Sequence, residues 1–366
     1  MKTHLQARRS VSPVRRHAVV AVAVVGMIVG ACTSARSGSA ASTSTSAATV
    51  AAHRPGTADV AFAGSLLAVD DKVVGPGFAH ATGYAYTGRG GGSLGLAHEI
   101  ASGEIAPGVF ESVGSGPIAM VGSRRSPWYV QFAASPLVIA FNPSGTFGPT
   151  FERVAAGRLP LADAFDAMAA PGFRLGRTNP ATDPQGQAFV MMVELAQRTL
   201  GLPAGIVEQI LGPGATTGGT GTTGQIFSET SLDAHLQAGQ LDAASAFRSQ
   251  AVQLHLHYLT LPAAIDLGDP ADASGYATAS LVVPATTTQA ATTVHGAPLA
   301  IDIATVSEPA EAADDAAAAT AFVAYQLSAA GRQAYAAAGF TLLPATVVGA
   351  RSSVPASVLA AVRASG

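Results

Sequence analysis

From Asp59 onward the chain alternates short apolar segments with helical ones, and this alternation limits the fold more than any other feature. The segment around Asp59 predicts a buried strand that runs into Gly64 and Ser65 and then into an apolar helical stretch. Residues 84–88 lead in the same way into a run of glycines and Ser93, which is a good N-cap for the next helix. Strands that alternate with helices are typical of an α/β architecture, which is the fold class that we expect.

The alternation continues towards the C-terminus. Asp183 as N-cap and Pro184 at the first helical position form the clearest helix start, before an apolar run that ends at Gly201. A last helical region is expected from Glu308 to Gly339, with a break near Gly331. Strands are expected within residues 108–113, 136–141, 173–180, 257–262, 276–284 and 297–306, and helices within residues 149–157, 160–169 and 250–255.

The N-terminal residues carry the signs of export and of a lipid anchor. Five basic residues and no acidic one precede an uncharged stretch from Ala18 to Ala31, which is the pattern of a signal peptide. The stretch ends in Val29-Gly30-Ala31-Cys32, which resembles the bacterial lipobox, where cleavage precedes the cysteine and its thiol takes a diacylglycerol. We expect residues 1–31 to be a lipoprotein signal peptide and Cys32 to be the lipid attachment site. The alternative is an ordinary secretory signal that leaves a free cysteine.

Composition limits the partners and the source of stability. Removal of residues 1–31 leaves 15 basic and 23 acidic residues, a formal charge of −8, which argues against a nucleic-acid partner. Cys32 is the only cysteine, so no intramolecular disulfide can form and the apolar core must stabilise the fold. Residues 32–56 are mostly Ser, Thr, Ala and Gly, which predicts a flexible tether. The whole chain has 48% hydrophobic residues, and its part after the tether is long enough for an ordered body with two lobes.

Three strand-to-helix junctions are candidates for anion binding. They lie at Gly64-Ser65, Gly92-Ser93 and Asp183-Pro184. Free backbone N–H groups at a helix N-terminus favour negative charge, and so does the helix dipole. Each junction alone is explained as a helix cap, but three that converge on one cleft would form an oxyanion site.

Motifs of enzymes and metal sites are not evident. The glycine run of residues 88–93 lacks the Lys-Ser/Thr ending of a phosphate loop, and no GxSxG motif offers a nucleophile. We therefore expect no enzymatic activity, no cofactor and no metal site. His255 and His257 are placed on one face of a strand edge and have no third ligand nearby. The acidic pairs Asp70-Asp71 and Asp314-Asp315 are interpreted as solvated helix faces.

In their order, these features resemble the molybdate/tungstate-binding lipoproteins of ABC importers, especially the archaeal-type branch. The likeness covers roughly Asp59 to Val348. It rests on the segments FAGSL, VFESV, FAASPLVIAFNP, TNPATDPQG, SLDAHLQAGQLDAASAFRSQAVQ, GAPLAIDIATV and AGFTLLP.

The resemblance implies a type II periplasmic-binding-protein fold, in which an oxyanion is bound in a cleft between two lobes joined by two crossing segments. The first lobe would comprise residues 57–137 and, with the return crossing, residues 266–350. The second lobe would comprise residues 138–265, and residues 351–366 would be a C-terminal tail.

The resemblance also implies the ligand-binding residues. Gly64, Ser65, Gly92 and Ser93 would act from the first lobe, and Asp183 with the backbone near Gln185 from the second. In the archaeal-type branch an aspartate at the position of Asp183 and a glutamate close to a Lys/Arg-Ser dipeptide approach the metal. Alignment of that dipeptide on Arg248-Ser249 puts Ala246 in place of the glutamate and Phe247 in place of a tyrosine. The sequence thus leaves open whether Asp183 coordinates the ligand or only caps a helix.

The implied function is that of an extracytoplasmic lipoprotein, held on the outer face of the cytoplasmic membrane. It would capture molybdate or tungstate as a monomer and deliver it to the permease and ATPase of an ABC importer. Two alternatives remain at this point. One is the same fold with sulfate or another small solute, and the other is a surface lipoprotein that serves interaction or sensing instead of transport.

Overall fold

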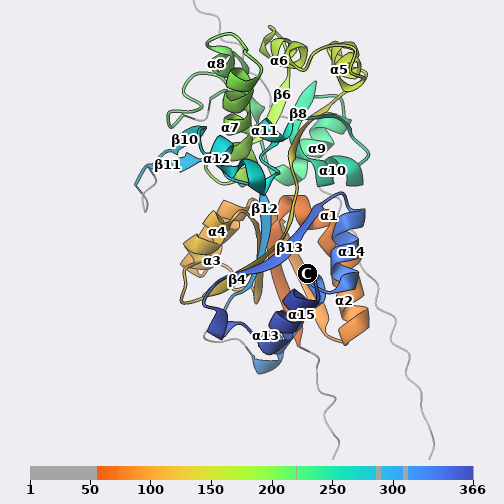
Figure 1. Ribbon diagram of the computed structural model, residues 1–366, viewed down its shortest axis with the longest axis vertical. Helices are drawn as coiled ribbons and strands as arrows, with labels where there is room; N and C mark the ends of the chain where they lie inside the picture. The colour runs from red at the N-terminus through yellow and green to blue at the C-terminus, as the bar shows by residue number, and fades with distance from the viewer. Residues whose placement is uncertain (1–55, 220, 286–289, 308–311, 366) are drawn as a thin grey trace, which may run out of the picture. The chain divides into compact units, whose positions relative to one another are not determined.

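The computed structural model describes residues 56–219, 221–285, 290–307 and 312–365 (Figure 1). The predicted signal peptide, the lipid attachment site at Cys32 and almost all of the tether lie outside the described residues. Within the described part of the chain, no helix is both long enough and apolar enough to cross a membrane.

The first lobe is built on a mixed six-stranded sheet with the strand order β13-β4-β12-β3-β1-β2. β1 is parallel to β2 and β3, whereas β12 runs antiparallel to β3 and β4, and β13 runs antiparallel to β4. Central strands such as β3 are buried on both faces, as is typical when helices cover both sides of a sheet. The strands are β1 (Thr57–Ala63), β2 (Ala85–Gly91), β3 (Val109–Val113), β4 (Trp128–Ala134), β12 (Ala300–Thr305) and β13 (Thr341–Gly349).

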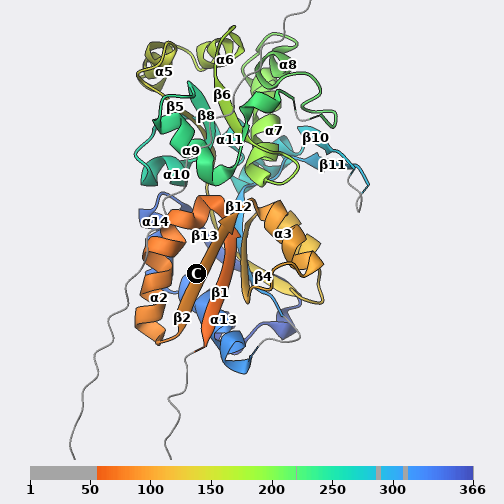
Figure 2. The same ribbon diagram turned by 180° about the vertical axis from the view of Figure 1, so that it is seen from behind.

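Helices cover both faces of this first sheet (Figures 1 and 2). α3 (Ser93–Ser102) and α4 (Ser115–Val121) pack on one face through an apolar cluster that contains Leu96, Ile100 and Phe110. On the other face lie α2 (Gly75–Thr82), α13 (Ala313–Gln326) and α14 (Ala329–Ala337). The chain after β1 forms the 3₁₀ turn η1 (Gly64–Leu66), α1 (Leu67–Val69) and the π-helical turn η2 (Asp70–Val74), and the C-terminal part adds η5 (Arg351–Ser353) and α15 (Ala356–Ala364).

The second lobe is built on a five-stranded sheet with the strand order β7-β6-β8-β5-β9. The chain enters it from β4 through Ser135 and Pro136, and returns to the first sheet between β9 and β12. The predicted α/β fold with two lobes and two crossing segments is therefore confirmed. The strands are β5 (Leu137–Phe141), β6 (Leu175–Thr178), β7 (Ile226–Phe227), β8 (Ala243–Phe247) and β9 (His257–Thr260).

The long helix α7 (Pro184–Thr199) is the core helix of the second lobe, and most of its residues are buried. Pro184 stands at its first position, as predicted, where a missing N–H costs nothing. The other helices are α5 (Gly148–Ala155), α6 (Ala162–Ala169), α8 (Ile206–Leu211), α9 (Glu229–Gln237), α10 (Arg248–Gln253), α11 (Ala263–Asp266) and α12 (Ala273–Tyr276), with η3 (Thr223–Gln225), η4 (Pro270–Asp272) and the hairpin of β10 (Ser280–Val283) and β11 (Thr292–His295).

Several local predictions are wrong. The N-cap of α3 is Gly92, and Ser93 is the first helical residue. The predicted break in the C-terminal helical region is present, but it lies at Leu327 and Ser328, because the Ser328 hydroxyl caps α14, and Gly331 lies inside that helix. His255 is not in a strand: it adopts a positive φ of 52° in the turn before β9, so it does not share a strand face with His257.

Asp70 is the largest exception among the predicted solvated acids. It is fully buried, whereas Asp71 is exposed as expected. Leu66 and Val74, four residues before and after it, are also buried, so Asp70 lies on the core-facing side of its turn.

Candidate functional site

The second and third predicted junctions lie against each other at the contact of the two lobes. The backbone N–H of Gly95, in the first turn of α3, donates a hydrogen bond to the Thr182 carbonyl oxygen at 3.0 Å. A Cβ atom added at Gly92 would lie 2.7 Å from the same oxygen and 3.4 Å from Asp183 Oδ2. The approach is so close that only glycine fits, and it brings the N-termini of α3 and α7 together.

The first junction meets the second lobe at a residue that the sequence did not identify, Glu229. A Cβ atom added at Gly64 would lie 2.6 Å from Glu229 Oε2, at the first residue of α9. Ser65 is buried, and within the described residues its hydroxyl oxygen has no hydrogen-bond partner. The structure therefore brings all three junctions to the lobe contact, with an unused hydroxyl group at the first.

Asp183 acts as the N-cap of α7, as predicted. Its Oδ1 accepts a hydrogen bond from the Gln185 backbone N–H at 2.8 Å. Burial is the main cause that raises the pKa of Asp183 to about 6, opposed by the Gln185 N–H and by the nearby Thr178 hydroxyl. A helix cap alone does not need so deeply buried a carboxylate, since capping residues are effective at the surface as well.

Glu229 is also buried, and it forms no ion pair with any residue in the described part of the chain. Burial raises the pKa of the Glu229 carboxyl well above its usual range, and the neighbouring Asp183 and Asp233 carboxylates raise it further. The Ser65 backbone and the nearby Ser65 hydroxyl, which forms no hydrogen bond within the described residues, lower it. Asp183 and Glu229 are thus two interacting carboxylates in one desolvated place, where both cannot be charged without a cation or a proton.

A buried amide network holds this pair in position. The Gln185 side chain donates from Nε2 to Gln250 Oε1 at 3.0 Å and accepts from the Ser245 hydroxyl at 2.8 Å. Gln250 Nε2 in turn lies 3.4 Å from Glu229 Oε1 as a donor. The Gln185 side chain is therefore committed within the second lobe, and it links the start of α7 to the start of α9.

Ser93 is buried, and its Oγ accepts a hydrogen bond from the Val113 backbone N–H at 3.2 Å. Because that contact uses the hydroxyl as an acceptor, its proton remains available for an acceptor at the lobe contact. Ser93 can thus serve as a donor even though it is not the N-cap.

Ala246 faces the apolar interior of the second lobe. It lies in β8 within an apolar cluster that contains Val138, Leu232 and Leu236. Because side chains alternate along a strand, the neighbouring Ser245 points to Gln185 instead, and a glutamate at position 246 would enter the apolar cluster. The second buried carboxylate at the lobe contact is that of Glu229. The sequence did not single it out, because an acid in the first turn of a helix is an ordinary feature.

The histidines and acids do not form a metal centre of their own. Among the described residues, no group of three or more His, Cys, Asp or Glu side chains could hold a metal ion. His257 instead lies 2.8 Å from Glu152 Oε1 through its Nδ1 at the surface. The lobe contact therefore offers hydroxyl and N–H donors together with two carboxylates.

Comparison with known proteins gives a family for this arrangement. A family described as bacterial extracellular solute-binding protein matches residues 58–341. A putative ABC transporter molybdenum-binding protein of Haloferax volcanii is 38% identical over 173 residues, which cover 47% of this chain and 49% of that relative. The chain thus spans about half the length of that relative. An uncharacterized solute-binding protein of Halobacterium salinarum is 29% identical over 238 residues, 65% of this chain and 70% of the relative.

Solved structures share the fold at low sequence identity. The periplasmic molybdate-binding protein of Azotobacter vinelandii has a TM-score of 0.51 at 16% identity, covering 79% of this chain and 99% of that one. A sulfate-binding protein of Mycobacterium tuberculosis has a TM-score of 0.50 at 13% identity, covering 85% and 92%. These likenesses confirm the two-lobed periplasmic-binding-protein fold.

Proposed function

Because the chain belongs to the bacterial extracellular solute-binding protein family, we propose that it captures a tetrahedral oxyanion, molybdate or tungstate, for an ABC importer. One observation carries this proposal: three helix starts and two buried carboxylates converge at the lobe contact. The molybdenum-binding relative from Haloferax volcanii supports the same ligand class.

In this proposal the donors come from both lobes. The Ser65 hydroxyl is unused, the Ser93 hydroxyl retains its proton, and the first turn of α3 supplies backbone N–H groups. The fold already holds these donors in place, so little conformational entropy is lost when an anion binds to them. Gly64 and Gly92 allow the backbone of the first lobe to approach the second lobe closely. The Gln185 backbone N–H holds the Asp183 carboxylate, and the Gln185 side chain holds Gln250, which in turn contacts Glu229.

The two carboxylates favour molybdate or tungstate over sulfate and phosphate. A dianion beside Asp183 and Glu229 is repelled unless these groups hold protons or bind the central atom directly. Hexavalent molybdenum and tungsten accept more than four oxygen ligands, whereas sulfur in sulfate does not. We therefore propose that Asp183 and Glu229 bind the metal of the oxyanion, and that the sulfate alternative is disfavoured.

The proposal extends to the cellular setting. The protein would be exported, held at the membrane through a lipid on Cys32, and would act as a monomer that meets its permease and ATPase partners after the lobes close on the ligand. It would bind and release its ligand without catalysing a reaction.

A thermal-shift and calorimetry screen with molybdate, tungstate, sulfate and phosphate tests the proposal. A ligand bound only by the folded state stabilises it by about 2.7 kcal/mol at a hundredfold excess over Kd. We expect clear stabilisation by molybdate and tungstate and little by sulfate or phosphate. Absence of stabilisation by both metal oxyanions would contradict the proposal.

A further inference from the structure

A groove leads outward from the first junction. It has a volume of about 210 Å³, and Ser65 and Glu229 form part of its wall. The groove is also lined by Lys72, Thr230, Asp233 and Gln237. We call this feature the Lys72 groove. It lies directly beside two buried residues of the proposed binding site, Ser65 and Glu229.

Lys72 is the only cationic residue that lines this groove, and it is the only lysine after residue 31. The other ionisable residues of the wall, Glu229 and Asp233, are acidic. A dianion that enters is therefore attracted by Lys72 and repelled by the carboxylates. Over distances up to about 10 Å these interactions are only partly screened at moderate salt. Without Lys72 the groove would repel the ligand.

The local fold keeps Lys72 free to point into the groove. Its neighbour Asp70 accepts a hydrogen bond from the Tyr335 hydroxyl at 3.0 Å inside the core, and Asp71 accepts one from the Tyr86 hydroxyl at 3.0 Å. These contacts fix the π-helical turn η2 from two sides, while Lys72 is exposed and forms no ion pair with any residue that the structure describes. The turn thus presents, beside the site, an ammonium group that is not held in an ion pair within the described residues.

A second opening lies on the other side of the lobe contact, and its charge is compensated. It is lined by Gly92, Thr182, Arg89 and Glu99. Arg89 Nη1 lies 3.6 Å from Glu99 Oε2, so its cation already has an anionic partner. The two openings therefore differ in what they offer an approaching anion.

From this difference we propose that Lys72 is the capture residue of the protein: it attracts the oxyanion into the Lys72 groove and positions it for Ser65 and the carboxylates. This inference rests on the proposed function. Its effect falls on the association rate constant, because charges along an entry path change the encounter more than the bound state.

Stopped-flow measurement of molybdate binding at low and high ionic strength tests the inference. Lys72→Gln is expected to lower the association rate constant about fivefold at ~0.02 M salt and less than about twofold at ~0.5 M salt. The dissociation rate constant should hardly change, and Lys72→Arg should restore the wild-type rate. The substituted side chain is exposed, so the variants are expected to fold.

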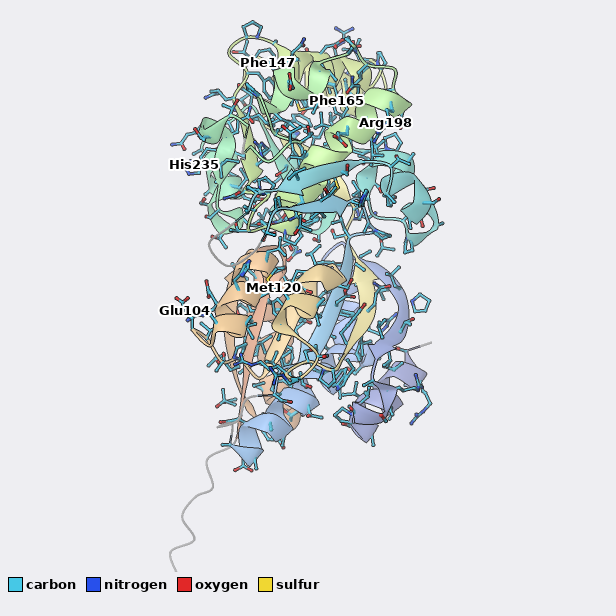
Figure 3. All side chains as sticks on the ribbon, turned by 90° about the vertical axis from the view of Figure 1, so that its left-hand side faces the viewer. Glu104, Met120, Phe147, Phe165, Arg198 and His235 are labelled. Carbon is cyan, nitrogen blue, oxygen red and sulfur yellow. The ribbon has the colours of Figure 1, made fainter. Side chains whose placement is uncertain are left out.

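Two variants with the same loss of charge serve as controls. Arg198→Gln changes a residue near the C-terminal end of α7 (Figure 3), which begins at the site and runs away from it for 16 residues. Arg89→Gln changes the other opening. Both should bind within about twofold of the wild-type rate.

The outcomes separate the two proposals. If wild-type protein binds neither molybdate nor tungstate, the proposed function fails, and the role of Lys72 fails with it. If wild-type protein binds but Lys72→Gln associates as fast as Arg198→Gln, or Arg89→Gln is the slow variant, only the role of Lys72 is overturned. A change confined to the dissociation rate constant would overturn it as well.

Discussion

Two pairs of buried carboxylates lie in this protein, one at the lobe contact and one inside the first lobe. Asp183 and Glu229 form the first pair, and Asp70 and Glu111 form the second. Burial raises the pKa of Asp70 to about 7 and that of Glu111 well above its usual range, much as it does for the first pair. In chemistry and burial the two pairs are alike.

They differ in what surrounds them. The Asp70 and Glu111 pair is enclosed by the core, where the Tyr335 hydroxyl donates to Asp70 at 3.0 Å and lies 3.5 Å from Glu111 Oε2. The Asp183 and Glu229 pair lies at the contact of two lobes, beside the unused Ser65 hydroxyl, and Glu229 reaches the Lys72 groove. A perturbed pKa therefore does not by itself identify a binding site, whereas access and unused donors do.

The largest expected effect is on molybdate affinity, which should depend on the pair at the lobe contact and not on the enclosed pair. The double variant Asp183→Asn, Glu229→Gln should weaken molybdate binding about a hundredfold, or about 2.7 kcal/mol, because the two carboxylates that we propose bind the metal are lost. Sulfate binding should be unchanged or stronger, because repulsion is relieved. The matched variant Asp70→Asn, Glu111→Gln should bind molybdate like the wild type by calorimetry, and a similar loss there would remove the distinction between the pairs.

A second substitution tests the enclosed pair through stability. Tyr335→Phe should lower the free energy of unfolding by about 2 kcal/mol, because buried Asp70 loses its hydroxyl donor. Urea unfolding measures the change, and Tyr84→Phe, whose ring stacks on Phe78, is the control. If Tyr335→Phe also weakened molybdate binding under conditions where the variant is fully folded, the enclosed pair would belong to the site.

The close approach at the lobe contact can be tested with two glycines of one segment. Gly92→Ala should weaken molybdate binding about tenfold, because the new methyl group would meet the Thr182 carbonyl oxygen at 2.7 Å and hold the lobes apart. At Gly95 the same methyl group would lie 3.8 Å from that oxygen, an ordinary contact. Gly95→Ala should therefore bind within about twofold, and equal losses in both variants would contradict the assigned contact.

A gradual effect is expected from a change of pH. Because folding raises the carboxyl pKa values of Asp70 and Glu111, the folded state keeps protons that the unfolded state releases above about pH 4. Their contribution to stability is complete below that pH and is lost as pH rises through about 7.

Unfolding of the ligand-free protein at several pH values measures this slope. Asp70→Asn, Glu111→Gln should reduce the loss of stability between about pH 5 and pH 7 by about 1 kcal/mol per pH unit. The remaining slope is expected to come from other buried acids such as Asp302, whose pKa burial raises to about 7. An unchanged slope would show that the pair is ionised in the folded state.

Features that depend on neighbouring residues were predictable from the sequence. The start of α7 followed from Asp183 and Pro184, and β1 and β3 from short apolar runs bounded by glycines. The three junctions were found because each is a local signal of strand, small residue and helix. The α/β fold followed from their alternation.

Features that depend on contacts between distant segments were not predictable. No strand was expected at residues 128–134, yet β4 forms there and pairs with β12 and β13. β13 contains Pro344, which a sheet tolerates at its edge, where the register with β4 shifts. Glu229 enters the site only because α9 meets Gly64 of the other lobe, and no spacing in the sequence encodes that contact.

X-ray absorption at the molybdenum edge tests the central claim most directly, that Asp183 and Glu229 bind the metal of the captured oxyanion. In the wild-type complex we expect more oxygen neighbours around molybdenum than the four of free molybdate. The Asp183→Asn, Glu229→Gln complex, saturated at high ligand concentration, should show the free tetrahedral anion. A tetrahedral spectrum in the wild-type complex would contradict the claim.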